Sequence, residues 1–418
     1  MTGVSSDTTS RMMRDLNSLC DFGGRLSGTP SEAAARDWLR QAGAEAMGVP
    51  AIPHEVPYEG WRATRVSLEI EGVGLVDAHP LLRSAATPPE GIEAEVVDLG
   101  RGIEADFVRV GDDLRGRIAM VRHEVMFSEG TFHRRKKLQL AQAAGAVGVL
   151  IVSRTPGGPV TGSARVEQET PPALGISPET AELLTDKGGK RRRAKFIIQT
   201  EEKPAVATNL IFDRAGPSGK WVVLSAHYDG HDLAESALDN ASGVAACLEV
   251  ARRLSKEPTP HGLRLAFFTV EEWGLQGSHR YLEEMDQSDR EDILLDANAD
   301  TVAGGSRLTA MTSGFPGLTA WMNNWANASG TDINIFEPFQ ANSDNASFAR
   351  FGIPAFRLVS GFNEPDAPVR HVLTPGDTRD LIAPEDMTRA ANLLEQITRE
   401  ALKSSVGDAM GWRAKNAD

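Results

Sequence analysis

The stretch Trp221-Val222-Val223-Leu224-Ser225-Ala226-His227-Tyr228-Asp229 decides the fold of this chain. Its apolar run, and a second run from Leu263 to Val270 that ends in Glu271-Glu272, are typical of short strands buried on both faces. A helical pattern over residues 243–254 lies between them. Strand, helix and strand in this order predict parallel neighbours, whose carboxyl ends share one edge of a sheet. We therefore expect the polar residues that follow the two runs to meet there.

The same alternation continues toward the end of the chain. Further strands are predicted near residues 297–301 and at 355–359, and further helices at 277–284, 317–328, 345–351 and 384–402. Before it, residues 10–48 have helical spacing and residues 51–72 alternate like edge strands. The pattern predicts an α/β fold with a mixed, largely parallel sheet that is flanked by helices.

Residues 74–205 interrupt this pattern. They contain short strands separated by turns, one clear helix at 132–144, and few metal-type ligands near one another. We interpret them as an inserted β-rich domain. The main domain is then discontinuous, with residues 1–73 and 206–404, and the polar segment 405–418 is predicted to be a frayed tail.

The composition narrows the class of protein. A chain of 418 residues with 41% apolar and 24% charged residues is expected to form two globular domains. It has no apolar run of about 18 residues, which argues against a membrane partner. The N-terminus lacks a basic start followed by an apolar run, and Cys20 and Cys247 are predicted to be buried free thiols. These features predict a cytoplasmic location.

The net charge of −14 argues against a nucleic-acid partner, because phosphate binding requires a concentrated basic surface. The basic run at residues 187–195 is a local exception. It leads directly into a predicted strand, so a solvated, charge-protected strand edge is favoured over a polyanion-binding patch.

The residues after the first strand have the chemistry of a metal site. His227 and Asp229 lie on the same side of an extended chain, and a carboxylate that accepts the second N–H of a histidine ligand fixes its tautomer. Asp239-Asn240 precedes a predicted helix and, taken alone, is more typical of an ordinary N-cap than of a metal ligand. His231 is a rival to His227, although its place beyond Gly230 favours a loop.

The later clusters add carboxylates and one histidine. Of the adjacent pair Glu271-Glu272, one side chain can hold a metal while the other takes a proton from water. Asp300 follows another predicted strand, with Asp296 as its rival, and His371 is the only histidine after residue 279. Histidine and carboxylate ligands with a shared carboxylate predict a di-zinc hydrolase.

These motifs resemble the co-catalytic zinc exopeptidases, which include the bacterial double-zinc leucyl aminopeptidases, plasma glutamate carboxypeptidase and glutamate carboxypeptidase II. The resemblance implies their phosphorylase/hydrolase-like fold and two zinc ions. It implies that His227 and Asp300 hold one ion, that Glu272 and His371 hold the other, and that Asp239 bridges them. Glu271 would be the general base, Asp229 would support His227, and Asp239-Asn240 would be a cis peptide.

Three further features belong to the resemblance. The family usually has His-Thr or His-Ser shortly before Asp-Thr, whereas Val372 and Leu373 intervene here between His371 and Thr374. The insertion resembles the protease-associated domain through residues 114–121, Lys137, Ala141 and residues 143–151, with a generic β-rich insertion as the alternative. It implies a lid or interaction module. The segment around Ser343 and Asp344 resembles a substrate-bordering segment, so the expected substrate contacts are Asn240, Ser343, Asp344 and Arg370.

The sequence thus predicts hydrolysis of a peptide or small amide, foremost by an aminopeptidase. A carboxypeptidase, a dipeptidase or a small-amide hydrolase is the runner-up, with Arg370, Arg357 or Arg307 as the clamp for a substrate carboxylate. A non-catalytic binding or receptor-like protein is a minor alternative. A homodimer is a candidate assembly.

Overall fold

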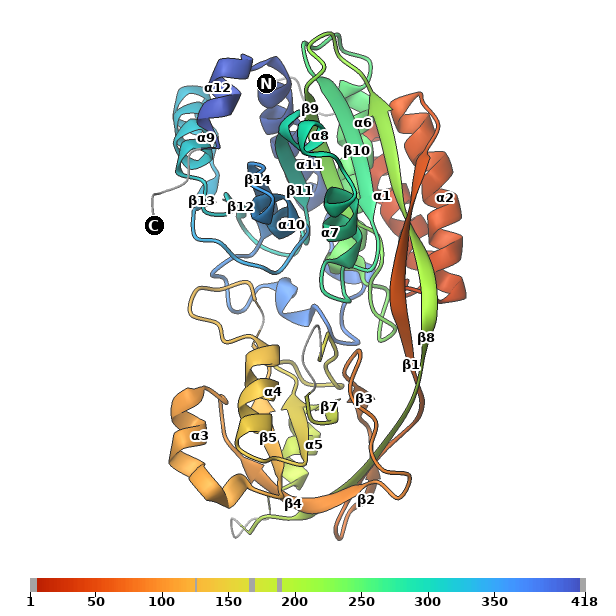
Figure 1. Ribbon diagram of the computed structural model, residues 1–418, viewed down its shortest axis with the longest axis vertical. Coiled ribbons are helices and arrows are strands. Elements are labelled where there is room, and N and C mark those ends of the chain that lie inside the picture. Colours follow the sequence, from red (N-terminus) through yellow and green to blue (C-terminus); the bar gives the residue numbers. More distant parts are fainter. Residues whose placement is uncertain (1–5, 125, 165–169, 186–189, 414–418) are drawn as a thin grey trace.

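The computed structural model describes residues 6–124, 126–164, 170–185 and 190–413. It has a larger α/β part and a smaller part, which lie one above the other in Figure 1. Two long strands, β1 (Ile52–Ile70) and β8 (Arg193–Arg214), pair antiparallel and run through both parts as one ribbon (Figure 1). The ribbon fixes how the two parts face each other.

The sheet of the larger part has the strand order β13-β12-β14-β11-β9-β10-β8. Strands β14, β11, β9 and β10 are parallel, whereas β8 is antiparallel to β10 and β12 is antiparallel to β14. The mixed, largely parallel sheet is therefore confirmed. The remaining strand bounds are β9 (Trp221–His227), β10 (Gly262–Phe268), β11 (Ile293–Ala299), β12 (Leu308–Met311), β13 (Asn334–Phe336) and β14 (Ala355–Ser360).

Helices cover both faces of this sheet. On one face α6 packs against α1, α2 and α11, and nearly every residue of α6 is buried, as its apolar composition predicts. On the other face lie α7 and α10, where Phe348 of α10 packs against Phe268 of β10 with ring centroids 6.0 Å apart. The helix bounds are α1 (Ser6–Asp21), α2 (Pro30–Met47), α6 (Ser242–Leu254), α7 (Gln276–Glu283), α8 (Gln287–Glu291), α9 (Pro316–Ser329), α10 (Asn345–Arg350) and α11 (Pro384–Lys403).

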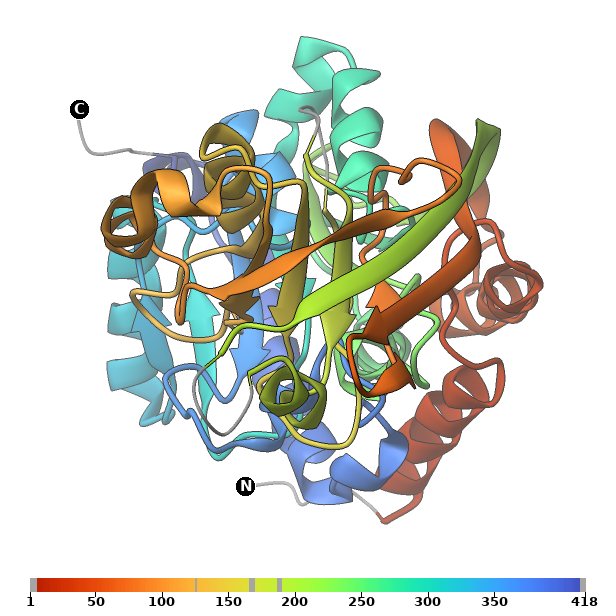
Figure 2. The same cartoon turned by 90° about the horizontal axis from the view of Figure 1, so that it is seen from below.

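The smaller part is itself α/β. Strands β4 (Ile92–Asp98), β5 (Ile118–Arg122), β6 (Gly148–Val152) and β7 (Ala173–Ile176) form a parallel ladder that joins β8 through β4. Figure 2, seen from below, shows this part in front of the larger one. Its other elements are β2 (Gly74–Val76), β3 (His79–Pro80), α3 (Glu104–Val110), α4 (Arg134–Ala143) and α5 (Pro178–Leu183). The expected boundary at residue 205 falls inside the continuous strand β8.

Two predicted surface features are the frayed C-terminal tail and the basic run at residues 187–195. The predicted frayed tail is wrong for its first residues, because α12 (Val406–Gly411) is helical and Trp412 is buried against Trp321, with ring centroids 4.6 Å apart. In the basic run, residues 187–189 lie outside the described residues. Arg191 and Arg193 form ion pairs with Asp113 and Glu93, which favours the solvated strand edge. Among the described helices, none combines the length and apolar character that crossing a membrane requires.

Candidate metal centre

The carboxyl ends of β9, β10 and β11 meet at one edge of the central sheet. Phe268 of β10 pairs with His227 of β9, and β11 lies on the other side of β9. His227 is the last residue of β9, Glu271 and Glu272 follow β10 after two residues, and Asp300 directly follows β11. Parallel pairing alone therefore brings histidine and carboxylate side chains from three separate segments to one place.

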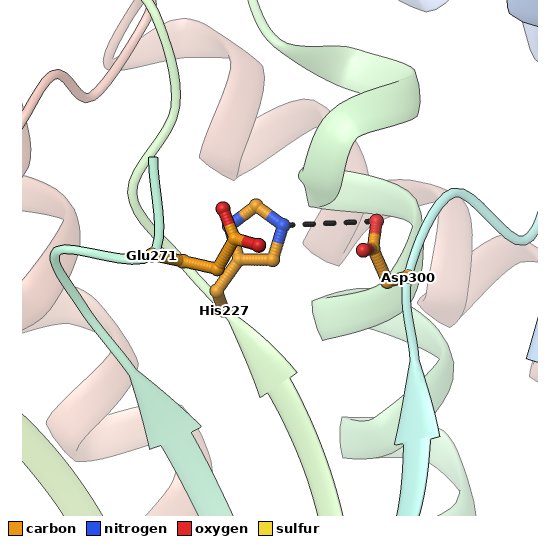
Figure 3. Close-up of side chains that lie close together, drawn as sticks. All are labelled: His227, Glu271 and Asp300. Carbon is orange, nitrogen blue, oxygen red and sulfur yellow. Dashed lines mark ion pairs between the residues drawn. The ribbon is translucent and has the colours of Figure 1, made fainter. Parts of the chain in front are cut away.

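His227, Glu271 and Asp300 form a first group of buried side chains. One ligand atom from each lies within 4.8 Å of the others. Figure 3 shows the imidazole of His227 between the two carboxylates, with its Nε2 atom 3.7 Å from Oδ1 of Asp300. The rival Asp296 is not in this group, because it is buried within the sheet, where Oγ of Ser225 donates a hydrogen bond to it at 2.7 Å.

His231, Asp239 and Glu272 form a second group with the same 4.8 Å limit. Nε2 of His231 lies 2.6 Å from Oε1 of Glu272. Asp239 connects the two groups, because its Oδ1 atom lies 3.1 Å from Nε2 of His227. A single carboxylate thus reaches donor atoms of both groups.

The donor atoms fit a pair of divalent cations. Nε2 of His227, Nε2 of His231 and Oε1 of Glu272 are buried without a hydrogen-bond partner, which is costly for polar atoms. The last two lie within contact distance of each other but lack hydrogen-bond geometry. Atoms that converge without bonding one another are what ligands of a common ion require. Imidazole nitrogen with carboxylate oxygen is a donor set that suits zinc.

Asp229 lies beneath the two glutamates. Its carboxylate accepts hydrogen bonds from the backbone N–H of Glu271 at 3.2 Å, from that of Glu272 at 3.4 Å, and from the hydroxyl of Ser27 at 3.0 Å. Nδ1 of His227 lies 3.6 Å from its Oδ1 and 3.1 Å from its backbone oxygen. The carboxylate thus fixes the turn that carries both glutamates, in addition to its contact with the histidine.

The segment that carries Asp239 is held from two sides. Asp377 accepts hydrogen bonds from the backbone N–H of Leu238 at 2.6 Å and of Asp239 at 3.3 Å. The side chain of Asn240 accepts from Gly243 and Thr301 and donates to Ala299. The expected cis peptide Asp239-Asn240 is present. Asp377, the first residue of the Asp-Thr pair near the C-terminus, is not among the predicted site residues.

Burial and the crowding of charged groups shift the pKa values of residues in the metal centre. Burial, together with the negative charges of Glu272 and Asp344, raises the pKa of Glu271 well above its ordinary value. For His227, burial lowers the pKa, but Glu271 and the neighbouring aspartates outweigh it and hold the pKa well above its ordinary value. Several buried carboxylates around a few cationic groups are electrostatically unfavourable until cations compensate them.

The sequence model of peptidase family M28 matches residues 209–398, which span every residue of both groups. This segment of the chain therefore resembles the M28 peptidases. The sequence model of the PA domain matches residues 87–184, so the insertion is a PA domain, the protease-associated domain that the sequence indicated. The M28 match and the aminopeptidase relatives indicate a zinc-dependent metallo-exopeptidase, and the two groups contain its candidate ligands.

Aminopeptidases are among the proteins that the chain resembles. The chain is 27% identical over 330 residues to aminopeptidase YwaD of Bacillus subtilis, which covers 77% of the chain and 69% of that protein. It is 27% identical over 315 residues to the probable lipoprotein aminopeptidase LpqL of Mycobacterium tuberculosis, covering 71% of the chain and 59% of LpqL. A solved zinc aminopeptidase from Bacillus subtilis superposes with a TM-score of 0.75 at 22% identity, over 96% of this chain and 97% of that one.

His371 lies outside both groups, so the structure does not support its prediction as a zinc ligand. Among the described residues no carboxylate forms an ion pair with it, and it lies in a short 3-10 turn, Pro368–His371. In the family pattern, the histidine stands directly before Thr, and here that position is Leu373. Leu373 lines the same cavity as Asp239 and Glu272. His231, the residue judged to be a mere loop histidine, occupies the second group instead.

The predicted substrate contacts are also displaced. A cavity of about 90 Å³ lies over the metal groups, and its described lining includes none of Asn240, Ser343, Asp344 and Arg370. Ser343 is fully buried and donates to Asn298, whereas Arg370 is half-buried beside Asp366. Their neighbour Asn342 does line the cavity, and so do residues of the PA domain that sequence reasoning missed, including three basic or histidine side chains. These are His123, His133 and Arg134.

Proposed function

We propose that this chain is an aminopeptidase that uses two zinc ions to hydrolyse the first peptide bond of its substrate. The observation that carries the proposal is the pair of adjoining ligand groups, which Asp239 connects, with Glu271 at their side. The similarity to aminopeptidase YwaD and to the probable aminopeptidase LpqL supports the same reaction.

The ligand set follows from the two groups. His227 and Asp300 would hold one ion, His231 and Glu272 would hold the other, and Asp239 would bridge both. This replaces the expected His371 by His231. Arg357 lies 3.1 Å from Oδ2 of Asp300, so that oxygen would be oriented by the guanidinium while Oδ1 faces His227.

Zinc at this centre would polarise the scissile carbonyl and lower the pKa of the attacking water. Glu271 is the carboxylate that remains for proton transfer. It would accept the proton of the water and donate it to the leaving nitrogen. Its buried position, with a pKa that burial raises, suits a group that must hold a proton between these two steps.

The cellular location and the oligomeric state of the enzyme remain predictions. A cytoplasmic location is favoured by Cys20 and Cys247, both of which are buried free thiols. The relative LpqL is described as a lipoprotein, which speaks for a different location of that protein. A homodimer remains the candidate assembly.

The proposal is tested by zinc analysis together with hydrolysis of a matched substrate pair. The pair is leucyl-glycinamide and its N-acetyl derivative, which differ only in the free α-amino group. An aminopeptidase should cleave the free amine at least about 10²-fold faster, and a chelator should abolish this activity until zinc is restored. Equal rates on both substrates would favour the runner-up hydrolases, and zinc-loaded protein without turnover would favour the non-catalytic reading.

A further inference from the structure

The glycine-rich loop between α1 and α2, residues 22–29, packs against the loop that follows β9, residues 228–236. The backbone N–H of Gly230 donates to the backbone oxygen of Arg25 at 3.2 Å. The hydroxyl of Ser27 donates to the carboxylate of Asp229 at 3.0 Å. The loop that carries His231 therefore rests on a segment about two hundred residues earlier in the chain.

Arg25 gathers the backbone of this region onto one buried side chain. Its side chain is 1% exposed, and its guanidinium donates to five backbone oxygens. Three of them belong to the loop after β9. They are the oxygens of Tyr228, at 3.0 Å from Nε, of Glu235, at 2.7 Å from Nη1, and of Ser236, at 2.7 Å from Nη2. One guanidinium thus fixes both ends of the loop, and His231 lies between them.

Gly24 brings the two loops into close backbone contact. A Cβ atom at this position would lie 1.5 Å from the backbone oxygen of His231 and 2.9 Å from that of Ala234. On its other side, the backbone N–H of His231 donates to Oγ of Ser236 at 2.9 Å. The backbone of His231 is therefore fixed from both sides, with its Nε2 atom 2.6 Å from Oε1 of Glu272.

The two ligand groups depend differently on this arrangement. His227 ends β9 and Asp300 directly follows β11, so strand pairing places both residues of the first group. His231 has no such support, because residues 228–236 contain neither helix nor strand. A displaced loop would therefore take one of three donors from the second group and leave the first group in place.

The charge of Arg25 by itself would act against metal binding. Burial lowers the pKa of its guanidinium, whereas the negative charges of Asp377, Asp229 and Asp239 act to raise it. A cation that interacts with these carboxylates repels a divalent ion, so removal of the charge alone should strengthen metal binding. Loss of the loop's anchor should weaken it. The two effects of Arg25 on metal affinity thus have opposite signs and can be told apart.

We infer that Arg25 is a positioning residue for the second metal ion, because it holds the loop 228–236 in the path that brings His231 to Glu272. The inference rests on the proposed di-zinc function and adds a residue outside the described lining of the cavity. A guanidinium suits this task, since it offers five N–H donors in fixed directions, whereas an ammonium offers three from one atom.

The test is a calorimetric titration of the metal-free full chain with zinc, which gives a dissociation constant for each ion. Arg25→Gln should weaken binding of the second ion by about 10- to 100-fold and leave the first within about twofold. Arg25→Lys should recover part of this loss, because it can keep some of the bonds to the backbone oxygens. Arg40→Gln, at an exposed position of α2, is the matched control and should bind both ions like the wild type.

A double-mutant cycle assigns the effect to His231. In the His231→Ala background, Arg25→Gln should cause no further loss of zinc affinity, because the donor that Arg25 positions is already absent. Gly24→Ala provides a second route, since it leaves the guanidinium intact and displaces the backbone oxygen of His231. It should also weaken the second ion selectively. Gly411→Ala, where a Cβ atom meets nothing within 4 Å, is its control.

Unchanged or tighter binding of the second ion in Arg25→Gln would overturn the inference, and so would an equal weakening of both ions. Additive losses in the double-mutant cycle would have the same consequence. If Arg25→Gln does not fold, Gly24→Ala decides, and normal binding of the second ion in that variant would refute the role of the loop. A wild type that binds two ions but does not cleave leucyl-glycinamide would refute the proposed aminopeptidase function, while the titrations would still decide the role of Arg25.

Discussion

Nε2 of His231 lies 2.6 Å from Oε1 of Glu272, and neither atom has a hydrogen-bond partner. This contact closes the second ligand group with a histidine from the loop after β9. The position directly before Thr374, where the family pattern has histidine, is occupied by Leu373. The second metal group is thereby built entirely from residues 231–272.

The first prediction separates the two histidines. His231→Ala should lower the zinc content from about two ions toward one per chain and reduce kcat/KM by at least about 10²-fold, because one of three donors of the second group is removed. His371→Ala is the matched control and should keep zinc content and activity close to wild type. Metal analysis after dialysis measures the first quantity. The reverse outcome, with zinc lost only in His371→Ala, would restore the original assignment.

The second prediction concerns proton transfer. Glu271→Gln should lower kcat by about 10²- to 10⁴-fold, because an amide cannot accept and return the proton of the attacking water. The zinc content should remain near that of the wild type, since His227, Asp239 and Asp300 still hold the first ion. Rate measurements at saturating substrate and metal analysis on the same sample test both parts. Near-normal turnover would remove Glu271 from its role.

The third prediction concerns the connection between the groups. Asp239→Ala should reduce the content of both ions, because Asp239 reaches donors of both groups. Asp296→Asn serves as a control, since this buried aspartate lies outside both groups and bonds Ser225 instead. It should retain metal. Two tightly bound ions in Asp239→Ala would contradict the bridging assignment.

The fourth prediction is a pH dependence of stability that arises in the PA domain. Burial and the charges of Arg134, Lys137 and Arg154 lower the pKa of His123 well below 6.5, so His123 is neutral when folded. The unfolded chain takes up a proton below about pH 6.5, so this contribution is complete above that pH and is lost as the pH falls. The free energy of unfolding of metal-free protein should decrease by up to about 1.4 kcal/mol per pH unit from this residue.

Denaturant unfolding of chelator-treated protein between pH 8 and pH 5.5 measures this slope. His123→Gln should flatten it. His133, whose pKa burial and its arginine neighbours also lower, contributes in the same direction and remains in this variant. An identical slope in wild type and His123→Gln would show that the titration of His123 does not couple to folding.

Much of the architecture could be predicted from local patterns. The apolar runs before His227 and Glu271 became parallel neighbours, and the helices expected at residues 243–254 and 384–402 are present within a residue or two. Such runs predict the position of a strand well, because continuous apolar strands are typical of the interior of a parallel sheet that helices cover on both faces. The PA insertion and the resemblance to the zinc exopeptidases were identified from the same kind of local evidence.

The misses share a physical cause. His371 was predicted as a zinc ligand from the resemblance to the zinc exopeptidases, whereas the path of each loop decides which side chain reaches the edge of the sheet. The four expected substrate contacts failed to reach the cavity for the same reason, since Asn240 and Ser343 turn inward to bond neighbouring polar groups. Loop conformation depends on packing against segments that are distant in the sequence, so the local sequence pattern does not predict it.

By itself, then, the sequence predicted the sheet and the two strand-end motifs, with Asp239 and Glu271 as candidates for the bridging ligand and the general base. It did so because strand pairing places the ends of parallel strands together whatever the loops do. Only the tertiary structure decided that His231 closes the second group and that Arg134 reaches the cavity from the PA domain. The long ribbon of β1 and β8 carries that domain over the edge of the sheet, so residues about a hundred positions apart share one small space.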